Sequence, residues 1–333
     1  MFRKISAFIL CLALMLPLCA VGAMAFEEAD AATPATETQS STGGASGRMG
    51  GRGGMMGGMG GASSEGHYAE AAEKFEQFEY TDEETGLTIP YNLYLPEGYE
   101  KSKDEYPLVI FIADASVNSD EVTAVLTQDG ATVWATEEEQ EKHPCIVLVP
   151  QYTTTLISEI GLLTTDENVW TDGLTLVKNL MDYVIDEYRV DENRVYGTGQ
   201  SQGGMSTIAI SDKYPDFYAA QFLVACQWDV EEMSAMVDDN LWIIVCEGDI
   251  KAYPGMNEAT ALWSELGAEV LTDDMWDSTS DAETFDALVA GMLEQDGSIR
   301  YNVFEGGSHM YTWTVAYTIE GIRDWLFEQS KEA

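Results

Sequence analysis

The chain has 333 residues, 58 of them acidic and 16 of them lysine or arginine, which gives a formal net charge of −42. A surface this acidic repels phosphate backbones and anionic lipids, so we expect no nucleic-acid partner. Hydrophobic residues make up 45% of the chain, which excludes a globally disordered protein and allows a sizeable core.

The first 25 residues have the pattern of a secretory signal peptide. A basic pair at 3–4 precedes an apolar run at 5–18, and the small residues at 23–25 fit a cleavage site. The alternative is an uncleaved membrane anchor, but a bilayer core needs about 20 apolar residues, more than this run supplies. We therefore expect a protein that is secreted or displayed at the cell surface.

Residues 26–66 change in character from Ala, Thr and Ser to a tract rich in Gly and Met. Such a composition cannot bury enough apolar surface to order itself, so it predicts a disordered tether. The tether would associate the rest of the protein with a cell surface.

Three cysteines remain after the predicted cleavage: Cys145, Cys226 and Cys246. Each lies in an apolar run and the count is odd, which favours buried thiols over a disulfide framework. A single bridge between Cys226 and Cys246 stays open, because both lie near predicted strand ends. The chain has no CxxC motif and no His/Cys cluster, so we expect no metal site.

Residues 67–333 alternate between buried strands and amphipathic helices. Segments 75–80 and 87–95 predict an antiparallel hairpin, and residues 174–188 and 315–326 carry apolar stripes at helical spacing. Continuous apolar runs, typical of strands buried on both faces, lie at 107–112, 145–149, 195–197, 222–225, 241–245 and 301–304. This pattern predicts one α/β domain with a mostly parallel twisted sheet, an N-terminal hairpin and helices on both faces.

A G-x-S-x-G motif at 199–203 places Ser201 directly after the strand at 195–197 and before a helical stretch. Strand, tight turn and helix are the context in which this motif exposes a nucleophilic serine. In this tight turn, side chains two residues before and after Ser201 would collide, so glycines fit at 199 and 203. We therefore predict that Ser201 is a nucleophile.

A serine hydroxyl needs a base to become reactive. The chain has three histidines. His67 lies at the edge of the tether, and His143 lies at the start of a buried strand, the wrong end for ligand binding. His309 follows the last predicted strand, and it alone comes after Ser201, as the order nucleophile, acid, histidine requires. His309 is therefore the predicted base.

The acid partner must lie between Ser201 and His309 at the carboxyl end of another strand. The run at 241–246 ends in Glu247-Gly248-Asp249. Asp249 sits in the turn where a carboxylate can hold the imidazole tautomer, and Glu247 is its rival. Acidic residues at 273–277 have the pattern of a solvated surface.

An oxyanion hole would use the backbone N–H of Gln202 and a second N–H from the loop after the strand at 107–112. We choose Ala115 as the second donor. In the same loop, Asp114 brings a carboxylate close to where negative charge would develop. It would turn away, stay protonated, or bind a cationic or polyol part of a substrate.

Together these motifs resemble a family of secreted bacterial α/β-hydrolases described as predicted peptidases or esterases, related to polyhydroxybutyrate depolymerases and feruloyl esterases. The resemblance rests on segments 94–99, 107–111, 142–144, 149–151, 194–205 and 307–309. It implies the α/β-hydrolase fold and a Ser-Asp-His triad at Ser201, Asp249 and His309. The family usually has a His-Gly pair where this chain has Ala113-Asp114.

Three aromatic residues lie where a pocket is expected: Trp228 after one strand, and Tyr311 and Trp313 beyond the predicted base. Their rings would either stack on a substrate or pack in the core. The expected function is a secreted serine hydrolase without a cofactor, which cleaves a small-molecule or polymer-linked acyl ester. The alternatives are a serine peptidase of the same fold, and a tethered binding protein with a degenerate site.

Overall fold

The structure is a computed structural model that describes residues 66–83 and 85–331. The predicted signal peptide and all but the last residue of the predicted tether lie outside the described residues. Within the described part of the chain, every helix is too short or too polar to cross a lipid bilayer.

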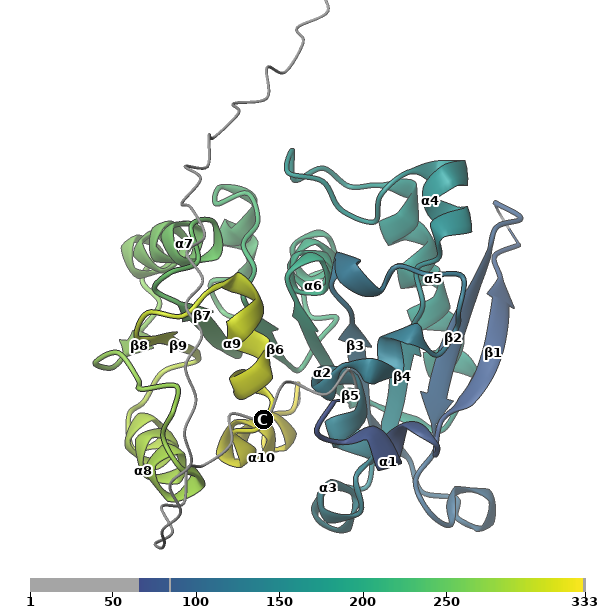
Figure 1. The fold of residues 1–333 in the computed structure, drawn as a ribbon, viewed down its shortest axis with the longest axis horizontal. Coiled ribbons are helices and arrows are strands. Elements are labelled where there is room, and N and C mark those ends of the chain that lie inside the picture. The colour runs from purple at the N-terminus through teal and green to yellow at the C-terminus, as the bar shows by residue number, and fades with distance from the viewer. Residues whose placement is uncertain (1–65, 84, 332–333) are drawn as a thin grey trace, which may run out of the picture. The chain divides into compact units, whose positions relative to one another are not determined.

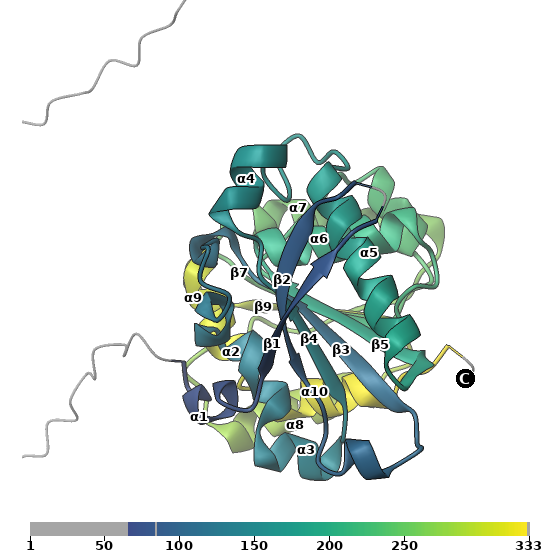
Figure 2. The same ribbon diagram turned by 90° about the vertical axis from the view of Figure 1, so that its right-hand side faces the viewer.

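Among the described residues, a nine-stranded sheet forms the centre of the fold, with the order β1-β2-β4-β3-β5-β6-β7-β9-β8. β1 pairs with β2, and β2 with β4, in antiparallel fashion, whereas the other neighbours are parallel. The strands are β1 (Glu76–Thr81), β2 (Thr88–Tyr94), β3 (Tyr106–Ile112), β4 (Ile146–Pro150), β5 (Val190–Gln200), β6 (Ala220–Val224), β7 (Leu241–Cys246), β8 (Val270–Thr272) and β9 (Ile299–Phe304). The predicted fold class is therefore confirmed, and Figure 2 shows the twist of the sheet.

Helices cover both faces of the sheet (Figure 1). α5, α6 and α7 pack on one face with the first core cluster, and α8 and α10 pack on the other face with the second. The helices are α1 (Ala69–Ala72), α2 (Asp129–Thr132), α3 (Glu137–Lys142), α4 (Thr154–Ile160), α5 (Asp172–Glu187), α6 (Gln202–Lys213), α7 (Ala252–Leu266), α8 (Ala282–Leu293), α9 (His309–Ala316) and α10 (Glu320–Phe327).

Strand β3 shows why the central strands read as continuous apolar runs. Leu108 and Ile110 pack in the first core cluster, whereas Val109 and Phe111 pack in the second. Because successive side chains of a strand point to opposite faces, a strand covered on both sides can be apolar at every position, as β3 is from Leu108 to Ile112.

The predicted helix at 315–326 is wrong as a single element. The structure has two helices there, α9 and α10, with a break at 317–319. Arg323 donates from Nη1 to the carbonyl of Tyr317 (2.7 Å), which satisfies a backbone acceptor left open at the end of α9. Sequence periodicity missed the break because Val315 and Ile322 still face the same core cluster.

Candidate active site

Ser201 occupies a sharp turn between β5 and α6. Its backbone has φ 52° and ψ −119°, a conformation that L-residues rarely adopt, and its N–H donates to the carbonyl of Val224 (3.1 Å). A Cβ atom at Gly203 would lie 1.7 Å from the carbonyl oxygen of Ile112. Glycine is therefore required at this position by the close approach of the β3 backbone.

His309 is the first residue of α9, and it lies next to Ser201. Its Nε2 is 2.8 Å from Ser201 Oγ, and its Nδ1 is 2.5 Å from Asp249 Oδ2. Gly306 and Gly307, with φ of +63° and +72°, turn the chain after β9 so that α9 starts at this point. Three side chains that are far apart in the sequence thus form one hydrogen-bonded chain.

Asp249 follows β7 and is 2% exposed. Burial raises the pKa of its carboxyl, but hydrogen bonds from His309 and from the N–H groups of Ala252 and Lys251 outweigh burial, so the pKa lies below its ordinary value. The rival Glu247 instead accepts from the N–H of Gly306 (3.1 Å). Geometry therefore favours Asp249 as the partner of the imidazole.

The two other histidines pair with different carboxylates. His67 Nδ1 lies 2.5 Å from Asp129 Oδ2, and His143 Nε2 lies 2.8 Å from Asp324 Oδ1. His143 and Asp324 belong, with Glu139, to the one group of possible metal ligands found among the described residues. Glu139 already accepts from Arg323 Nε (2.8 Å), so the group has a structural explanation without a metal.

A cavity of about 530 Å³ lies over the Ser201–His309–Asp249 chain. It is lined by Asp166, Ser201, Met205, Ala225, Gln227, Gly248, Asp249, Ile250, Lys251, Ser308 and His309. Lys251 Nζ pairs with Asp166 Oδ1 (2.8 Å), and Ile250 is 89% exposed. Asp166, Ile250 and Lys251 were not among the site residues predicted from the sequence. The position of Ile250 and Lys251 directly after Asp249 could have identified them, whereas Asp166 carries no comparable signal.

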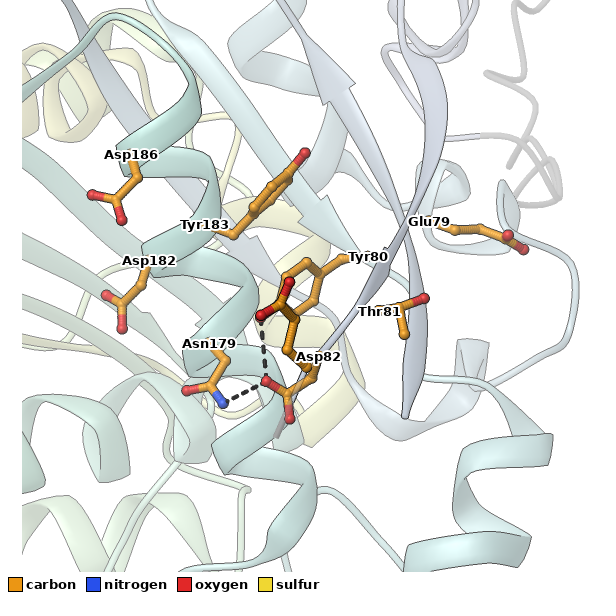
Figure 3. Close-up of a pocket in the computed structure, with 9 residues that line it drawn as sticks. Glu79, Tyr80, Thr81, Asp82, Asn179, Asp182, Tyr183 and Asp186 are labelled. Atoms are coloured by element: carbon orange, nitrogen blue, oxygen red, sulfur yellow. Dashed lines mark hydrogen bonds between the residues drawn. The ribbon is translucent and has the colours of Figure 1, made fainter. Parts of the chain in front are cut away.

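A larger cavity, of about 590 Å³, lies between β1 and α5 (Figure 3). Its lining is acidic, and Asp82 accepts from Asn179 Nδ2 (3.1 Å) and from the hydroxyl of Tyr80 (3.3 Å). The side chains that line it include no serine, cysteine or histidine. We therefore place the candidate active site at the cavity over Ser201.

The three aromatic residues predicted to bind substrate do not line the cavity over Ser201. Trp228 is 3% exposed and donates from Nε1 to Glu232 (2.8 Å), so it belongs to the core. Trp313 packs edge-on against the ring of His309, with 5.2 Å between centroids. Tyr311 is 37% exposed. Of the two alternatives for these rings, the structure shows core packing for Trp228, and it places the ring of Trp313 against the imidazole of His309.

Of the three alternatives for Asp114, the structure shows the one in which the side chain turns away from the site, and not the one in which it binds substrate. Its side chain is 4% exposed and lies outside the lining of the cavity. Oδ1 accepts from the N–H of Ser116 (2.7 Å), and Oδ2 accepts from Nε2 of Gln200 (2.7 Å) and of Gln128. The carboxylate is therefore turned inward. Ala115, the predicted oxyanion donor, follows it at the exposed start of a 3₁₀ turn.

Cys145, Cys226 and Cys246 are buried free thiols, so the bridge left open between the last two is not formed. Burial raises the pKa of each thiol. Protonated and enclosed, these thiols act as small apolar side chains.

Comparison with known proteins gives matches to hydrolases. The model of the prolyl oligopeptidase family matches residues 176–332, just under half of the chain. Feruloyl esterase B of Talaromyces funiculosus is 42% identical over 53 residues, 16% of this chain and 15% of the relative. Acetylxylan esterase A of Emericella nidulans is 41% identical over 44 residues, 13% of this chain and 14% of the relative.

A solved structure described as a thermostable esterase has a TM-score of 0.64 and 27% sequence identity, and the match covers 79% of this chain and 64% of that chain. The chain therefore spans less than two thirds of that protein and about one seventh of the two curated relatives. These matches, with the sheet order, confirm the predicted resemblance to α/β-hydrolases.

Proposed function

We propose that this α/β-hydrolase is a serine esterase that cleaves carboxylic esters through an acyl-enzyme on Ser201. The observation that carries the proposal is the hydrogen-bonded chain from Ser201 Oγ through both nitrogens of His309 to Asp249, at 2.8 and 2.5 Å. A serine held this way can lose its proton to the imidazole as it attacks.

In the first half of the reaction, Ser201 Oγ attacks the carbonyl carbon while His309 Nε2 takes the hydroxyl proton. The backbone N–H groups of Gln202 and Ala115 donate to the oxyanion, and the first lies at the start of α6, where the helix dipole favours negative charge. The tetrahedral intermediate collapses, the bond to the alkoxy oxygen breaks, and His309 gives its proton to the departing alcohol.

In the second half, water attacks the acyl-enzyme and gives its proton to His309 Nε2. The second intermediate breaks the bond to Ser201 Oγ, which takes the proton back, and the carboxylic acid leaves. Asp249 accepts from Nδ1 throughout, so the imidazole keeps the tautomer whose Nε2 is free to act as a base.

The substrate class that we propose is an acyl ester linked to a polymer, such as a feruloyl or acetyl group on a polysaccharide. The names of the two curated relatives and the description of the solved structure support an ester. A cavity of about 530 Å³ has room for an aromatic acyl group. Export of the protein, predicted from residues 1–25, would bring it to such polymers.

A peptidase is the second candidate, because the family model that matches residues 176–332 is that of the prolyl oligopeptidases. A series of p-nitrophenyl esters compared with peptide p-nitroanilides separates the two. We expect kcat/KM for the best ester to exceed that for any amide. Faster hydrolysis of an amide would reverse the assignment.

A fluorophosphonate probe tests the hydrolase against a tethered binding protein with a degenerate site. We expect stoichiometric labelling of Ser201 in the wild type and none in Ser201→Ala. Ser206, which lies in the next turn of α6 and donates to the carbonyl of Gln202 (2.8 Å), offers a matched control. Ser206→Ala should label like the wild type, and a folded wild type that resists labelling would contradict the esterase.

A further inference from the structure

The carboxylate of Asp114 joins two segments that are distant in sequence. It caps the 3₁₀ turn at Ala115–Val117 through the N–H of Ser116 (2.7 Å), and it accepts from Gln200 Nε2 (2.7 Å). Gln200 is the last residue of β5 and directly precedes Ser201. One buried side chain therefore joins the loop after β3 to the strand that ends directly before the nucleophile.

The same loop contacts the other side of the nucleophile. Asn118 Nδ2 donates to Gln202 Oε1 (3.3 Å), and a Cβ atom at Gly203 would lie 2.9 Å from the carbonyl oxygen of Ala113, the first residue of the loop. The loop after β3 thus contacts the residues on both sides of Ser201. Its position relative to Ser201 is set by these contacts.

The partners of Asp114 are neutral. Its three donors are the backbone N–H of Ser116 and the side-chain amides of Gln200 and Gln128. A carboxylate oxygen accepts more than one hydrogen bond, so a single Asp can bind all three donors. Burying a carboxylate costs free energy unless its oxygens accept hydrogen bonds. This cost favours the one arrangement of the two segments in which all three donors reach Asp114.

We propose that Asp114 is a positioning residue for the oxyanion hole, which fixes the N–H of Ala115 relative to Ser201 by joining the β3 loop to Gln200. This inference rests on the proposed function. An oxyanion donor must lie about 3 Å from the developing charge, so a small displacement of the loop removes much of its effect. Asp114 would act through Ala115 and would not touch the substrate.

The test compares Asp114→Ala and Gln200→Met with the wild type, with kcat normalised by fluorophosphonate titration of active sites. We expect kcat to fall roughly 30-fold in each variant with KM changed less than about threefold, since outright loss of one oxyanion donor costs about 10²–10³-fold. The inhibition constant of a boronic acid, whose adduct with Ser201 mimics the intermediate, should rise by a similar factor. The double variant should lose no more than the worse single variant, because each substitution cuts the same link.

Asp281→Ala is the matched control. Asp281 also caps a helix start, accepting from the N–H of Thr284 (3.0 Å), but it caps α8. We expect a lower Tm with unchanged kcat and unchanged boronic acid inhibition. Gln200→Met keeps a side chain of similar size, so it carries the test if Asp114→Ala does not fold.

The outcomes separate the two proposals. If the wild type hydrolyses esters and both variants retain wild-type kcat and boronic acid inhibition, the positioning role is wrong and the esterase stands. If the losses of kcat add in the double variant, Asp114 and Gln200 act independently, and this result would also contradict the positioning role. If the wild type neither hydrolyses esters nor reacts with the fluorophosphonate, the proposed function fails, and the inference fails with it.

Discussion

Two buried aspartates lie at the same edge of the sheet and differ in what they contact. Asp249, after β7, binds the imidazole of His309 and two backbone N–H groups, whereas Asp114, after β3, binds one backbone N–H and two amides. Only Asp249 faces a group that can become a cation during the reaction. The partners of a carboxylate, more than its place on the sheet, therefore decide its chemical role.

The largest effect in this comparison is expected for Asp249→Asn. An asparagine can hold the imidazole only in the wrong tautomer, so kcat should fall by about 10⁴-fold, far more than for Asp114→Ala. Steady-state kinetics with a p-nitrophenyl ester measures the loss. Glu247→Gln, two residues away, is the control and should change kcat less than about threefold. An equal loss of kcat in Glu247→Gln would contradict the assignment of Asp249 as the partner of His309.

The contact between β3 and the nucleophile turn is tested by Gly203→Ala. The added methyl would lie 1.7 Å from the carbonyl oxygen of Ile112, so we expect the free energy of unfolding to fall by more than about 3 kcal/mol. Gly291→Ala in α8 is the control, because nothing lies within 4 Å of its added methyl. It should raise stability by about 0.5–1 kcal/mol, as measured by denaturant unfolding. A stable, active Gly203→Ala would contradict the close approach.

The lowered pKa of Asp249 gives a pH dependence of stability. A carboxyl whose pKa is lower in the folded state stabilises that state above its unfolded pKa of about 4, and the contribution is lost as the pH falls through the folded pKa. The difference in Tm between the wild type and Asp249→Asn should therefore shrink between pH 6 and pH 3. A difference that grows toward acid pH would contradict the lowered pKa.

The smallest effect is expected at the mouth of the cavity. The ion pair of Lys251 with Asp166 is exposed on both sides, so Lys251→Ala should cost no more than about 0.5 kcal/mol of stability. Thermal unfolding and kcat/KM for a neutral ester should both stay near their wild-type values. A tenfold change in kcat/KM would show that this pair shapes the site.

The sequence allowed prediction of the fold and of the positions of Ser201, His309 and Asp249, because buried strands and the chain order of the motif are local signals. The directions of Asp114 and Trp228 could not be predicted in the same way. Asp114 is held by Gln128 and Gln200, and Trp228 is enclosed with Glu232 as the partner of its Nε1. Such orientations depend on tertiary contacts that spacing does not encode.

The most direct test of the account is the mass of the protein after brief reaction with p-nitrophenyl acetate and acid quenching. We predict one acetyl group per chain, located on Ser201 by peptide mapping, and none on Ser201→Ala. Undiminished ester hydrolysis by Ser201→Ala, or acetylation at another residue alone, would contradict the mechanism.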